Sequence, residues 1–402
     1  MAILTFQAAR KTVLEKILHN RPLPIQEFVP ILQTTGRVLA QNVLADRDFP
    51  PFPRSTRDGY AVLSADISSP PVKLRCAGLA RAGTSFNESM VSMQCVEIMT
   101  GAAVPQGADA VVMVEHTQRQ GDWVEIQKPA ASGENIVWQG SEARQGDEVI
   151  PQGRRLGYSE IAMMAAVGLS DVSVYQKPRV AILPTGDEIV DVAATPGPFQ
   201  IRNSNSYSLQ AQVASSGATA IPLGIAPDGE IRLRQLIVEG LTCDILLLSG
   251  GVSAGRFDLV EKVLSELGAE FYFEGVSMQP GKPLVFGTVN GTFFFGLPGN
   301  PISTMVTFEL FVCPALRILG GENFHPQPFL KARLAKNIRR KPGLASFLPA
   351  ILEGDSYDPV VSPLEWKGSG DLASLNRANC YLAVPEQAEE LQAGQWVSVL
   401  PR

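Results

Sequence analysis

Three short polar segments follow expected strands of an α/β sheet, and they carry the residues best suited to chemistry. They are residues 185–188 (TGDE), 249–255 (SGGVSAG) and 297–301 (LPGNP). Ligands of open α/β sheets bind beyond the carboxyl ends of the strands, so we expect the three segments to border one crevice. Glycine lets backbone N–H groups approach an anion, and the helix that follows adds a favourable dipole. The segments therefore predict a site for a phosphate-bearing ligand.

Residues in and near these segments are the predicted ligand contacts. Lys282 lies between two prolines, where a single ammonium group can meet phosphate or other oxyanion oxygens. Ser303 begins the helix after Pro301, where free N–H groups favour an oxyanion. Ser369, between two glycines, is expected to contribute from the C-terminal part. The predicted set is Gly250, Gly251, Ser253, Lys282, Pro298, Asn300, Pro301, Ser303 and Ser369.

Three carboxylates at or near strand ends suggest a divalent cation. Glu188, Asp228 and Asp258 are suited to a hard ion such as Mg²⁺, which keeps several waters and contacts phosphate oxygens. Each acid also has an ordinary structural explanation, as a helix cap or as part of a solvated turn. Capping is most plausible for Asp228, because it directly precedes a helix. The three histidines are isolated, and no two of them have the spacing of metal ligands.

Composition excludes several classes of protein. A chain of 402 residues exceeds what one hydrophobic core usually organises, so we expect more than one domain. The net charge of −6 argues against a nucleic-acid-binding face. No apolar run approaches the roughly 20 residues that span a membrane, and residues 1–20 are expected to form a cytoplasmic amphipathic helix rather than a signal peptide. Five cysteines without close pairing predict buried free thiols.

The pattern of elements predicts four parts. We expect an extended helical linking domain from residues 1–47 and 141–176, with a small β domain, residues 48–140, between its two segments. Residues 177–325 alternate strands and helices, which indicates a parallel sheet with helices on both faces. Residues 326–402 are short strands and proline-rich turns, which suggest a C-terminal β-barrel.

Several motifs together resemble one family. TRDGYAV, IMTGAAVPQGADAVVMVE, TGDEI, IRNSNSYSL, SGGVSAGRFD, PGKP, GLPGNPIS and GSGDL occur in the order seen in the molybdopterin molybdenumtransferases, which are related to the C-terminal domain of gephyrin. The resemblance covers nearly the whole chain. It implies an elongated dimer whose α/β part is a molybdopterin-binding-like domain.

The resemblance also implies an activity and further site residues. The expected reaction takes adenylylated molybdopterin and molybdate, uses a divalent cation, and releases AMP and the molybdenum cofactor. Asp58 and Thr100 are expected to complete the catalytic set with Glu188, Asp228 and Asp258, reaching the site from the dimer partner. The expected protein partners are the molybdopterin adenylyltransferase and recipient molybdoenzymes.

The chain departs from the family pattern by losing cations. The family usually has a lysine at Gln279, an arginine near Pro349 and an arginine-rich, then acidic, stretch where this chain has Val137 to Ala143. Arg256, where an acid is usual, is expected to return one positive charge to the crevice. These changes leave an alternative function open: a catalytically weakened paralogue that binds molybdopterin or acts as a scaffold. A related enzyme acting on another pterin or oxyanion is a third interpretation.

Overall fold

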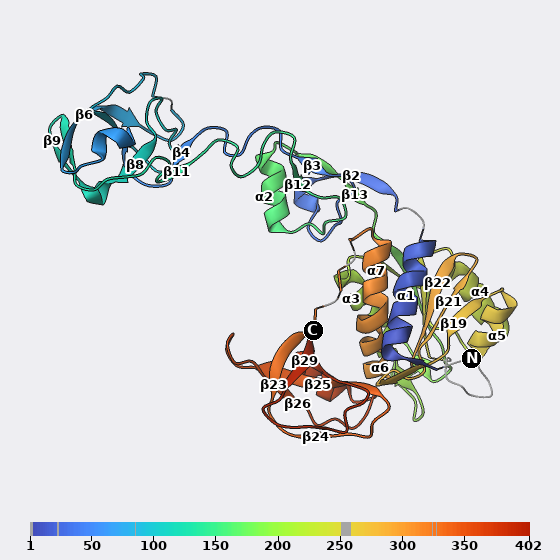
Figure 1. The fold of residues 1–402 in the computed structure, drawn as a ribbon. Helices are drawn as coiled ribbons and strands as arrows, with labels where there is room; N and C mark the ends of the chain where they lie inside the picture. The colour runs from blue at the N-terminus through green and yellow to red at the C-terminus, as the bar shows by residue number, and fades with distance from the viewer. Residues whose placement is uncertain (1–2, 22–23, 85, 251–258, 324, 327) are drawn as a thin grey trace.

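A computed structural model describes residues 3–21, 24–84, 86–250, 259–323, 325–326 and 328–402. The chain is elongated: a small β domain lies at one end, a narrow arm connects it to the α/β part, and a C-terminal β domain lies beside the α/β part (Figure 1). The multidomain α/β and β architecture predicted from the sequence is confirmed. The exact domain boundaries stay predictions.

The α/β part is built on a six-stranded sheet. Its order is β17 (Thr219–Pro222), β14 (Arg179–Pro184), β18 (Ile245–Ser249), β22 (Thr292–Leu297), β21 (Val285–Val289) and β19 (Glu270–Phe273). The first four strands are parallel, as the alternating pattern predicts. The last two pairings, β22 with β21 and β21 with β19, are antiparallel, and the short turn at residues 290–291 joins β21 to β22 as a hairpin. The sheet is therefore mixed rather than wholly parallel.

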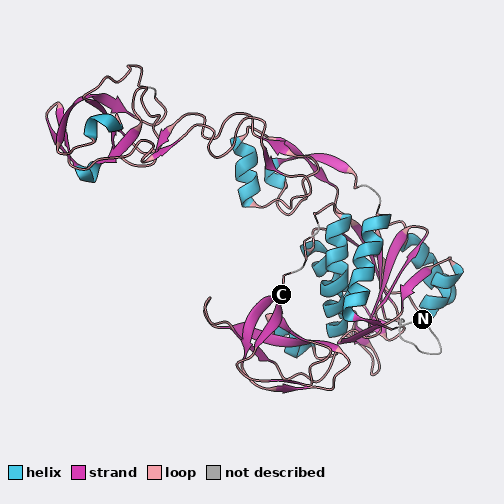
Figure 2. Ribbon diagram, in the orientation of Figure 1, coloured by secondary structure: helices cyan, strands magenta, loops and turns pink. Residues whose placement is uncertain are grey.

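Helices cover both faces of this sheet (Figure 2). Successive strand residues alternate between the faces, so Leu247 belongs to one core and Leu246 to the other. The first face packs against α3 (Ser204–Ser215) and a continuous helical stretch of α6 (Pro301–Thr307), the π-helix η4 (Phe308–Val312) and α7 (Cys313–Leu319). The second face packs against α4 (Glu230–Gly240) and α5 (Leu259–Glu266).

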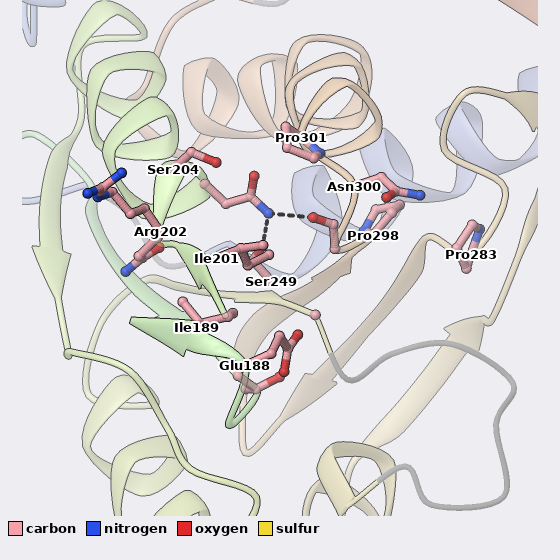
Figure 3. A pocket seen from close by; sticks show the side chains of 15 residues that line it. Glu188, Ile189, Ile201, Arg202, Ser204, Ser249, Pro283, Pro298, Asn300 and Pro301 are labelled. Atoms are coloured by element: carbon pink, nitrogen blue, oxygen red, sulfur yellow. Dashed lines mark hydrogen bonds between the residues drawn. The ribbon is translucent and has the colours of Figure 1, made fainter. Parts of the chain in front are cut away.

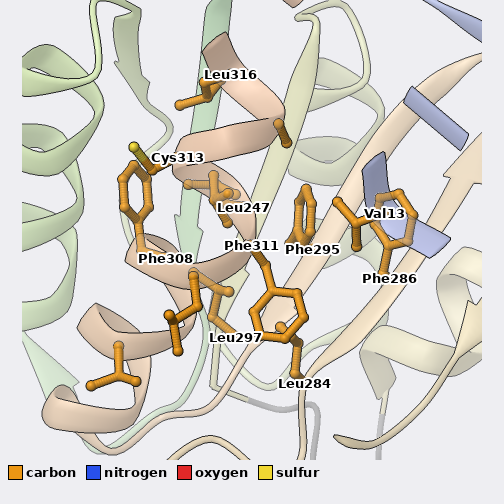
Figure 4. Packing of buried hydrophobic residues seen from close by; sticks show 14 of the residues in the cluster. Val13, Leu247, Leu284, Phe286, Phe295, Leu297, Phe308, Phe311, Cys313 and Leu316 are labelled. Atoms are coloured by element: carbon orange, nitrogen blue, oxygen red, sulfur yellow. The ribbon is translucent and has the colours of Figure 1, made fainter. Parts of the chain in front are cut away.

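The N-terminal helix α1 (Phe6–Asn20) belongs to the α/β core. Its residues Phe6, Val13 and Ile17 are buried in the same cluster as Phe311, and Figure 4 shows Val13 among the phenylalanines. Strand β1 (Leu4–Thr5) pairs with β20 (Val276–Gln279) and holds the start of this helix. This packing differs from the predicted division, which grouped residues 1–47 with the arm, because sequence periodicity shows an apolar face but not its partner.

The helical stretch Pro301–Leu319 is long and apolar enough to cross a membrane by those two measures alone. Its most apolar window is 83% buried inside the protein, and its α7 part packs beside α1. Burial in a core explains its composition, so the stretch is weak evidence for a membrane span.

The distal β domain contains a six-stranded sheet. Its order is β8 (Ala110–Met113), β5 (Gly59–Val62), β7 (Gln94–Ile98), β6 (Val72–Ala80), β10 (Trp123–Ile126) and β9 (Thr117–Gln120). One core cluster, which includes Val62, Leu74 and Cys95, fills one side of it. The paired strands β4 (Arg54–Ser55) and β11 (Ile136–Val137) carry the chain into and out of the domain.

The arm consists of two strand pairs and one helix. Strand β2 (Gln26–Pro30) pairs with β13 (Asp171–Tyr175), and β3 (Val43–Leu44) pairs with β12 (Glu148–Ile150), next to helix α2 (Tyr158–Ala166). Arg155 joins the arm to the α/β part, because its guanidinium donates to Glu322 Oε2 and to the Gly36 and Ser216 carbonyl oxygens. This bonding fixes the arm at its base.

The C-terminal domain is a closed five-stranded barrel. Its strands are β23 (Leu330–Leu334), β25 (Ala345–Glu353), β26 (Val360–Pro363), β27 (Cys380–Val384) and β29 (Trp396–Pro401), and the β25–β27 pairing closes the ring. Strand β20 of the α/β part adds to β25, so the barrel is joined to the body by backbone pairing. The pair β24 (Ile338–Arg339) and β28 (Glu390–Leu391) lies outside the ring, and α8 (Leu372–Arg377) packs near α6.

Candidate active site

A cavity of about 400 Å³ lies beyond the carboxyl ends of β14, β18 and β22. All three segments singled out in the sequence reach it: Thr185 and Glu188, Ser249 and Gly250, and residues 298–301. Figure 3 shows Glu188 on one side of the cavity and Asn300 and Pro301 on another. The short paired strands β15 (Ile189–Val190) and β16 (Ile201–Arg202) and the start of α3 complete the wall.

Glu188 is positioned by the glycine two residues before it. Gly186 has a φ of +138°, and a Cβ atom there would lie 2.4 Å from Glu188 Oε2. A side chain at residue 186 would therefore displace the Glu188 carboxylate, and the positive φ of this residue also favours glycine. The neighbouring Asp187 accepts a hydrogen bond from the backbone N–H of Asp228 (3.0 Å), which holds the exposed Asp228 loop beside this turn.

Gly250 has a structural reason to be glycine. Its φ is +92°, and a Cβ atom would lie 2.7 Å from the Thr185 carbonyl oxygen. The backbones at the ends of β14 and β18 are thus in direct contact with no side chain between them. Close approach of a ligand, the reason expected from the sequence, is not needed to explain this glycine, although Gly250 does line the cavity.

Asn205 ties together two walls of the cavity, and the sequence analysis did not select it. Its amide Nδ2 donates to Ser249 Oγ (2.9 Å) and to the Gly299 carbonyl oxygen (2.8 Å), the two bonds drawn in Figure 3. The carbonyl can only accept, so the amide orientation is settled and Oδ1 is the atom left over. Asn205 Oδ1 is buried and has no hydrogen-bond partner.

Thr185 is a second buried polar group without a partner. The residue is only 5% exposed, and its Oγ1 makes no hydrogen bond. A buried hydroxyl without a partner costs about 1–3 kcal/mol. Thr185 and Asn205 both line the cavity, so its wall contains two unsatisfied polar groups from separate segments of the chain. Such groups in a wall are explained best by a ligand that supplies the missing bonds.

The start of α6 brings the C-terminal domain to the cavity. Asn300 is the N-cap residue and Pro301 follows it, so the backbone N–H of Ile302 is the first one available. This N–H donates to the Ser369 carbonyl oxygen (3.0 Å), which places the predicted contributor Ser369 beside the predicted residue Ser303. Ser303 itself is 4% exposed.

The segment that carries Ser369 is held by Asp371. The Ser374 hydroxyl, together with the backbone N–H groups of Lys367 and Ser374, lowers the pKa of Asp371 to about 2. Asp371 therefore stays ionised and caps α8 across the physiological range. This anchoring gives the partly exposed Gly368–Gly370 turn a defined position next to α6.

Lys282 lies on a loop whose shape is determined by close packing. A Cβ atom on Gly281 would lie 2.5 Å from Thr307 Cγ2, and the Lys282 carbonyl accepts from the Val276 N–H (2.9 Å). The Lys282 side chain is exposed, and the next residue, Pro283, lines the cavity. In the residues that the structure describes, no hydrogen bond or ion pair holds the Lys282 ammonium group, which belongs to the residue one position before the cavity wall at Pro283.

The Arg340 guanidinium lies against Gln279, the position at which a lysine is expected from the family pattern. Arg340 Nη1 donates to Gln279 Oε1 (3.1 Å) and to Ser346 Oγ (3.2 Å), and these two acceptors are opposite each other in the β20–β25 pair. Partial burial lowers the pKa of Arg340. Among the described residues, none of the ion pairs involves Arg340. The sequence analysis missed this residue, because the contact joins strands of two domains.

Asp58 and Thr100 contact each other in the distal β domain. Asp58 Oδ1 accepts from the Thr100 backbone N–H (2.7 Å) and hydroxyl (3.0 Å), and the backbone bond is the main cause of the lowered pKa of Asp58. Both residues are exposed. In a single chain they lie at the opposite end of the molecule from the cavity (Figure 1).

Four of the residues discussed from the sequence fall outside the described residues. These are Gly251, Ser253, Arg256 and Asp258. Within the part of the chain that is described, no three acidic, histidine or cysteine side chains gather at one point to hold a metal ion. Glu188 lines the cavity, whereas Asp228 is not among its lining residues and is held near Glu188 through the bond of its backbone N–H to Asp187. A carboxylate such as Glu188 suits an ion bound by one or two carboxylates and by phosphate oxygens.

Comparisons with known proteins agree with this geometry. Three family models match successive parts of the chain: "MoeA N-terminal region (domain I and II)" over residues 4–168, "Probable molybdopterin binding domain" over 181–318, and "MoeA C-terminal region (domain IV)" over 331–401. A molybdopterin molybdenumtransferase of Haemophilus influenzae is 30% identical over 99% of this chain and 98% of its own length. The chain belongs to the molybdopterin molybdenumtransferase family.

Further relatives support the same membership. The molybdopterin molybdenumtransferase of a Nostoc species is 38% identical over 93% of this chain and 88% of its own length. A crystal structure of a molybdopterin biosynthesis MoeA protein from Pyrococcus horikoshii is 33% identical, covers 100% of this chain and 99% of the other, and has a TM-score of 0.75. Another crystal structure of a molybdopterin biosynthesis MoeA protein from Pyrococcus horikoshii has a TM-score of 0.83 at 28% identity and covers 100% of both chains.

The first prediction concerns the unpaired hydroxyl. Thr185→Val keeps the shape of the side chain and removes an unsatisfied polar atom, so we expect the free energy of unfolding to rise by about 1 kcal/mol. The measurement is urea denaturation of the ligand-free protein. Thr304→Val is the matched control, because the buried Thr304 hydroxyl donates to the Pro298 and Asn300 carbonyl oxygens and its loss should destabilise the protein. A Thr185→Val protein as destabilised as the control would contradict the assignment.

Proposed function

We propose that this protein inserts molybdenum from molybdate into adenylylated molybdopterin, with release of AMP and the molybdenum cofactor. The observation that carries the proposal is the cavity itself. It combines the carboxylate of Glu188, unsatisfied polar atoms of Thr185 and Asn205, and the start of α6 within one space. Membership of the molybdopterin molybdenumtransferase family supports the same activity.

The charged groups have separate roles in this proposal. Glu188, Asp228 and Asp258 hold a divalent cation, for which Mg²⁺ is the natural choice given oxygen ligands. Charge neutralisation on the pyrophosphate oxygens is the chemistry that this ion supplies when it is bound. The residues Lys282, Ser303 and Ser369 hold the molybdate oxygens, and the strand ends at Gly250, Gly251 and Ser253 and at Pro298, Asn300 and Pro301 hold the pterin ligand.

Neutral polar groups in the wall suit the pterin rather than the phosphates. Asn205 Oδ1 can only accept a hydrogen bond, and it would repel an ionised phosphate oxygen. A pterin ring offers N–H donors that satisfy such an acceptor. We therefore assign the Thr185 and Asn205 side of the cavity to the ring, and the α6 side to the anions.

A homodimer completes the site in this proposal. Asp58 and Thr100 lie too far from the cavity of their own chain to act there, so we propose that they enter the cavity of a second copy. The arm carries exposed apolar side chains suited to a dimer contact: Ile25, Phe28, Leu32 and Tyr158, of which Tyr158 is 91% exposed. We further propose a cytoplasmic location, delivery of substrate by the molybdopterin adenylyltransferase, and transfer of product to recipient molybdoenzymes.

One observation favours a second candidate function. Gln279 and the buried Pro349 replace cations of the family pattern, which weakens the grip on an oxyanion. A protein that binds molybdopterin without turnover, as a scaffold, would tolerate these changes. Arg340 argues for the enzyme, because it returns a positive charge to the Gln279 position.

The second prediction tests the activity. Purified protein supplied with adenylylated molybdopterin, molybdate and Mg²⁺ should release AMP, which chromatography measures. Glu188→Gln should lower the rate by about 10²-fold or more while ligand still binds, because the lost charge stabilises the transition state more than docking. Glu239→Gln, an exposed acid on α4, is the control and should retain the parent rate. Ligand binding without AMP release by the parent protein would favour the scaffold.

The third prediction tests the shared site. An Asp58→Ala chain and a Glu188→Gln chain should each be inactive alone, and mixing them should restore part of the activity. Heterodimers would contain one intact site, made of a normal cavity and a normal Asp58. Light scattering should give twice the chain mass of 43.2 kDa. A monomer mass over a wide concentration range, or no recovery in mixed and refolded samples, would refute this arrangement.

The fourth prediction concerns the cation at Gln279. Arg340→Gln should weaken molybdate binding by roughly tenfold, the effect of losing one charge-assisted hydrogen bond in a partly desolvated site. Isothermal titration with molybdate at two salt concentrations measures the change. The control is Arg339→Gln, since this neighbour is exposed and paired with Glu390 (3.2 Å). Equal affinities in the parent and Arg340→Gln proteins would show that Arg340 does not replace the missing lysine.

A further inference from the structure

Two cysteines that are 19 positions apart in the sequence are neighbours in the distal β domain. Cys76 on β6 and Cys95 on β7 are directly paired in a parallel register. Paired residues of adjacent strands point to the same face, and the strands lie about 4.7–4.9 Å apart, which is within the Cα separation that a disulfide bridges. Cys95 is fully buried, and Cys76 is partly buried against the same core cluster.

The two thiols interact and differ in reactivity. Burial first, and then the adjacent Cys76 thiol, raise the pKa of Cys95 to about 12. Cys95 is therefore a neutral thiol at physiological pH, and Cys76, which is partly exposed, is the sulfur that can react first. The other three cysteines, Cys243, Cys313 and Cys380, are buried in other parts of the chain.

An arginine and a glutamate lie near Cys76. The Arg119 guanidinium lies close enough to the Cys76 thiol for that thiol to be the main cause of the raised pKa of Arg119. Arg119 also bonds to Glu97, which is on β7 two residues after Cys95. A partly exposed sulfur paired with a buried thiol is the arrangement of a reactive and a resolving cysteine.

The pair is connected to the Asp58–Thr100 contact through two short strands. Strand β7 runs from Gln94 to Ile98 and reaches Thr100 two residues later, while β5 begins one residue after Asp58. Cys95 pairs with Val62 and Ile98 pairs with Gly59 in this antiparallel pair. Gly59 also packs directly on β8, because a Cβ atom there would lie 1.9 Å from the Val112 carbonyl oxygen. The pairing of Ile98 with Gly59 gives a displacement of β7 a direct route to the residues next to Asp58 and Thr100.

We propose that Cys76 and Cys95 form a reversible disulfide, and that this modification displaces the Asp58–Thr100 pair and lowers activity. The oxidant is a peroxide. The Cys76 thiolate attacks one peroxide oxygen, the O–O bond breaks, and the departing hydroxide takes a proton to become water. The Cys95 sulfur then attacks the sulfenic acid on Cys76, the S–O bond breaks, and the leaving hydroxide takes the Cys95 proton to give a second water. Two electrons pass from the two sulfurs to the peroxide.

The bond changes the geometry because it brings the two sulfurs to about 2.05 Å, well inside van der Waals contact. The strands β6 and β7 must adjust, and their register is already irregular between Cys76 and Leu79. In a reducing compartment such a bond is transient, which suits a sensor rather than a structural link. The loss of activity rests on the proposed function, but formation of the disulfide does not.

The first experiment detects the bond in the full-length protein. The protein is treated with stoichiometric hydrogen peroxide, the remaining thiols are alkylated, and the products are analysed by intact mass and peptide mapping. We expect a species lighter by two hydrogens, with the Cys76 and Cys95 peptides linked, and dithiothreitol should reverse it. Cys76→Ser should abolish the species, whereas Cys243→Ala and Cys380→Ala should still form it. Oxidation of Cys76 to sulfinic acid without a link to Cys95 would overturn the proposal.

The second experiment tests the connection to Asp58 and Thr100. Hydrogen exchange of peptides covering residues 94–101 should change on oxidation in the parent protein and stay constant in Cys76→Ser. AMP release should fall several-fold on oxidation, recover with dithiothreitol, and resist peroxide in Cys76→Ser. A disulfide that changes neither exchange nor activity would overturn the regulatory role. If the reduced protein releases no AMP at all, the proposed function fails, while the mass and exchange results still decide the disulfide.

Discussion

The crevice depends on direct backbone contact between the ends of adjacent strands. Gly250 packs against the Thr185 carbonyl oxygen, and Gly186 leaves room for the folded-back Glu188 carboxylate. Asn205 then bonds to the ends of both β18 and β22 through Ser249 and Gly299. A side chain at Gly250 would separate the strand ends, because it would clash with the Thr185 backbone, whereas a side chain at Gly186 would displace the Glu188 carboxylate. Every other feature of the cavity is arranged around this close packing.

The same packing leaves polar groups exposed to the cavity rather than to each other. The Asn205 amide uses both of its hydrogens to hold the loops, so its oxygen has no protein donor. Thr185 is buried by the strand contact that Gly250 makes possible, and its hydroxyl is left without a partner. Stability is given up at these positions, as is common at binding sites. Hydrogen bonds to a bound ligand can offset the free-energy cost of these two unsatisfied atoms.

Long-range backbone pairing determines how the domains meet. Strand β20 pairs with β1 on one side and with β25 of the barrel on the other, so the N-terminus, the α/β part and the C-terminal domain are joined in one sheet. This sheet brings Arg340 to Gln279, and the bond from Ile302 to Ser369 brings the barrel segment to α6. The distal β domain is joined only by the arm, so its Asp58 and Thr100 remain far from the cavity of their own chain.

Much of the architecture could be predicted from local patterns. Alternating strands and helices indicated the α/β part, glycine and polar residues at strand ends indicated Glu188, Gly250 and Asn300 as cavity residues, and the motifs indicated the family. These features depend on residues that are close in sequence, where periodicity and turn chemistry are informative. Only the tertiary structure decided other features. These are the antiparallel pairing of β21, the packing of α1 on α7, the unpaired atoms of Thr185 and Asn205, the Arg340–Gln279 contact and the Cys76–Cys95 pair. Each arises from strands or helices that meet across many residues of chain, and a sequence pattern records that a face is apolar or a group polar without recording which distant partner covers it.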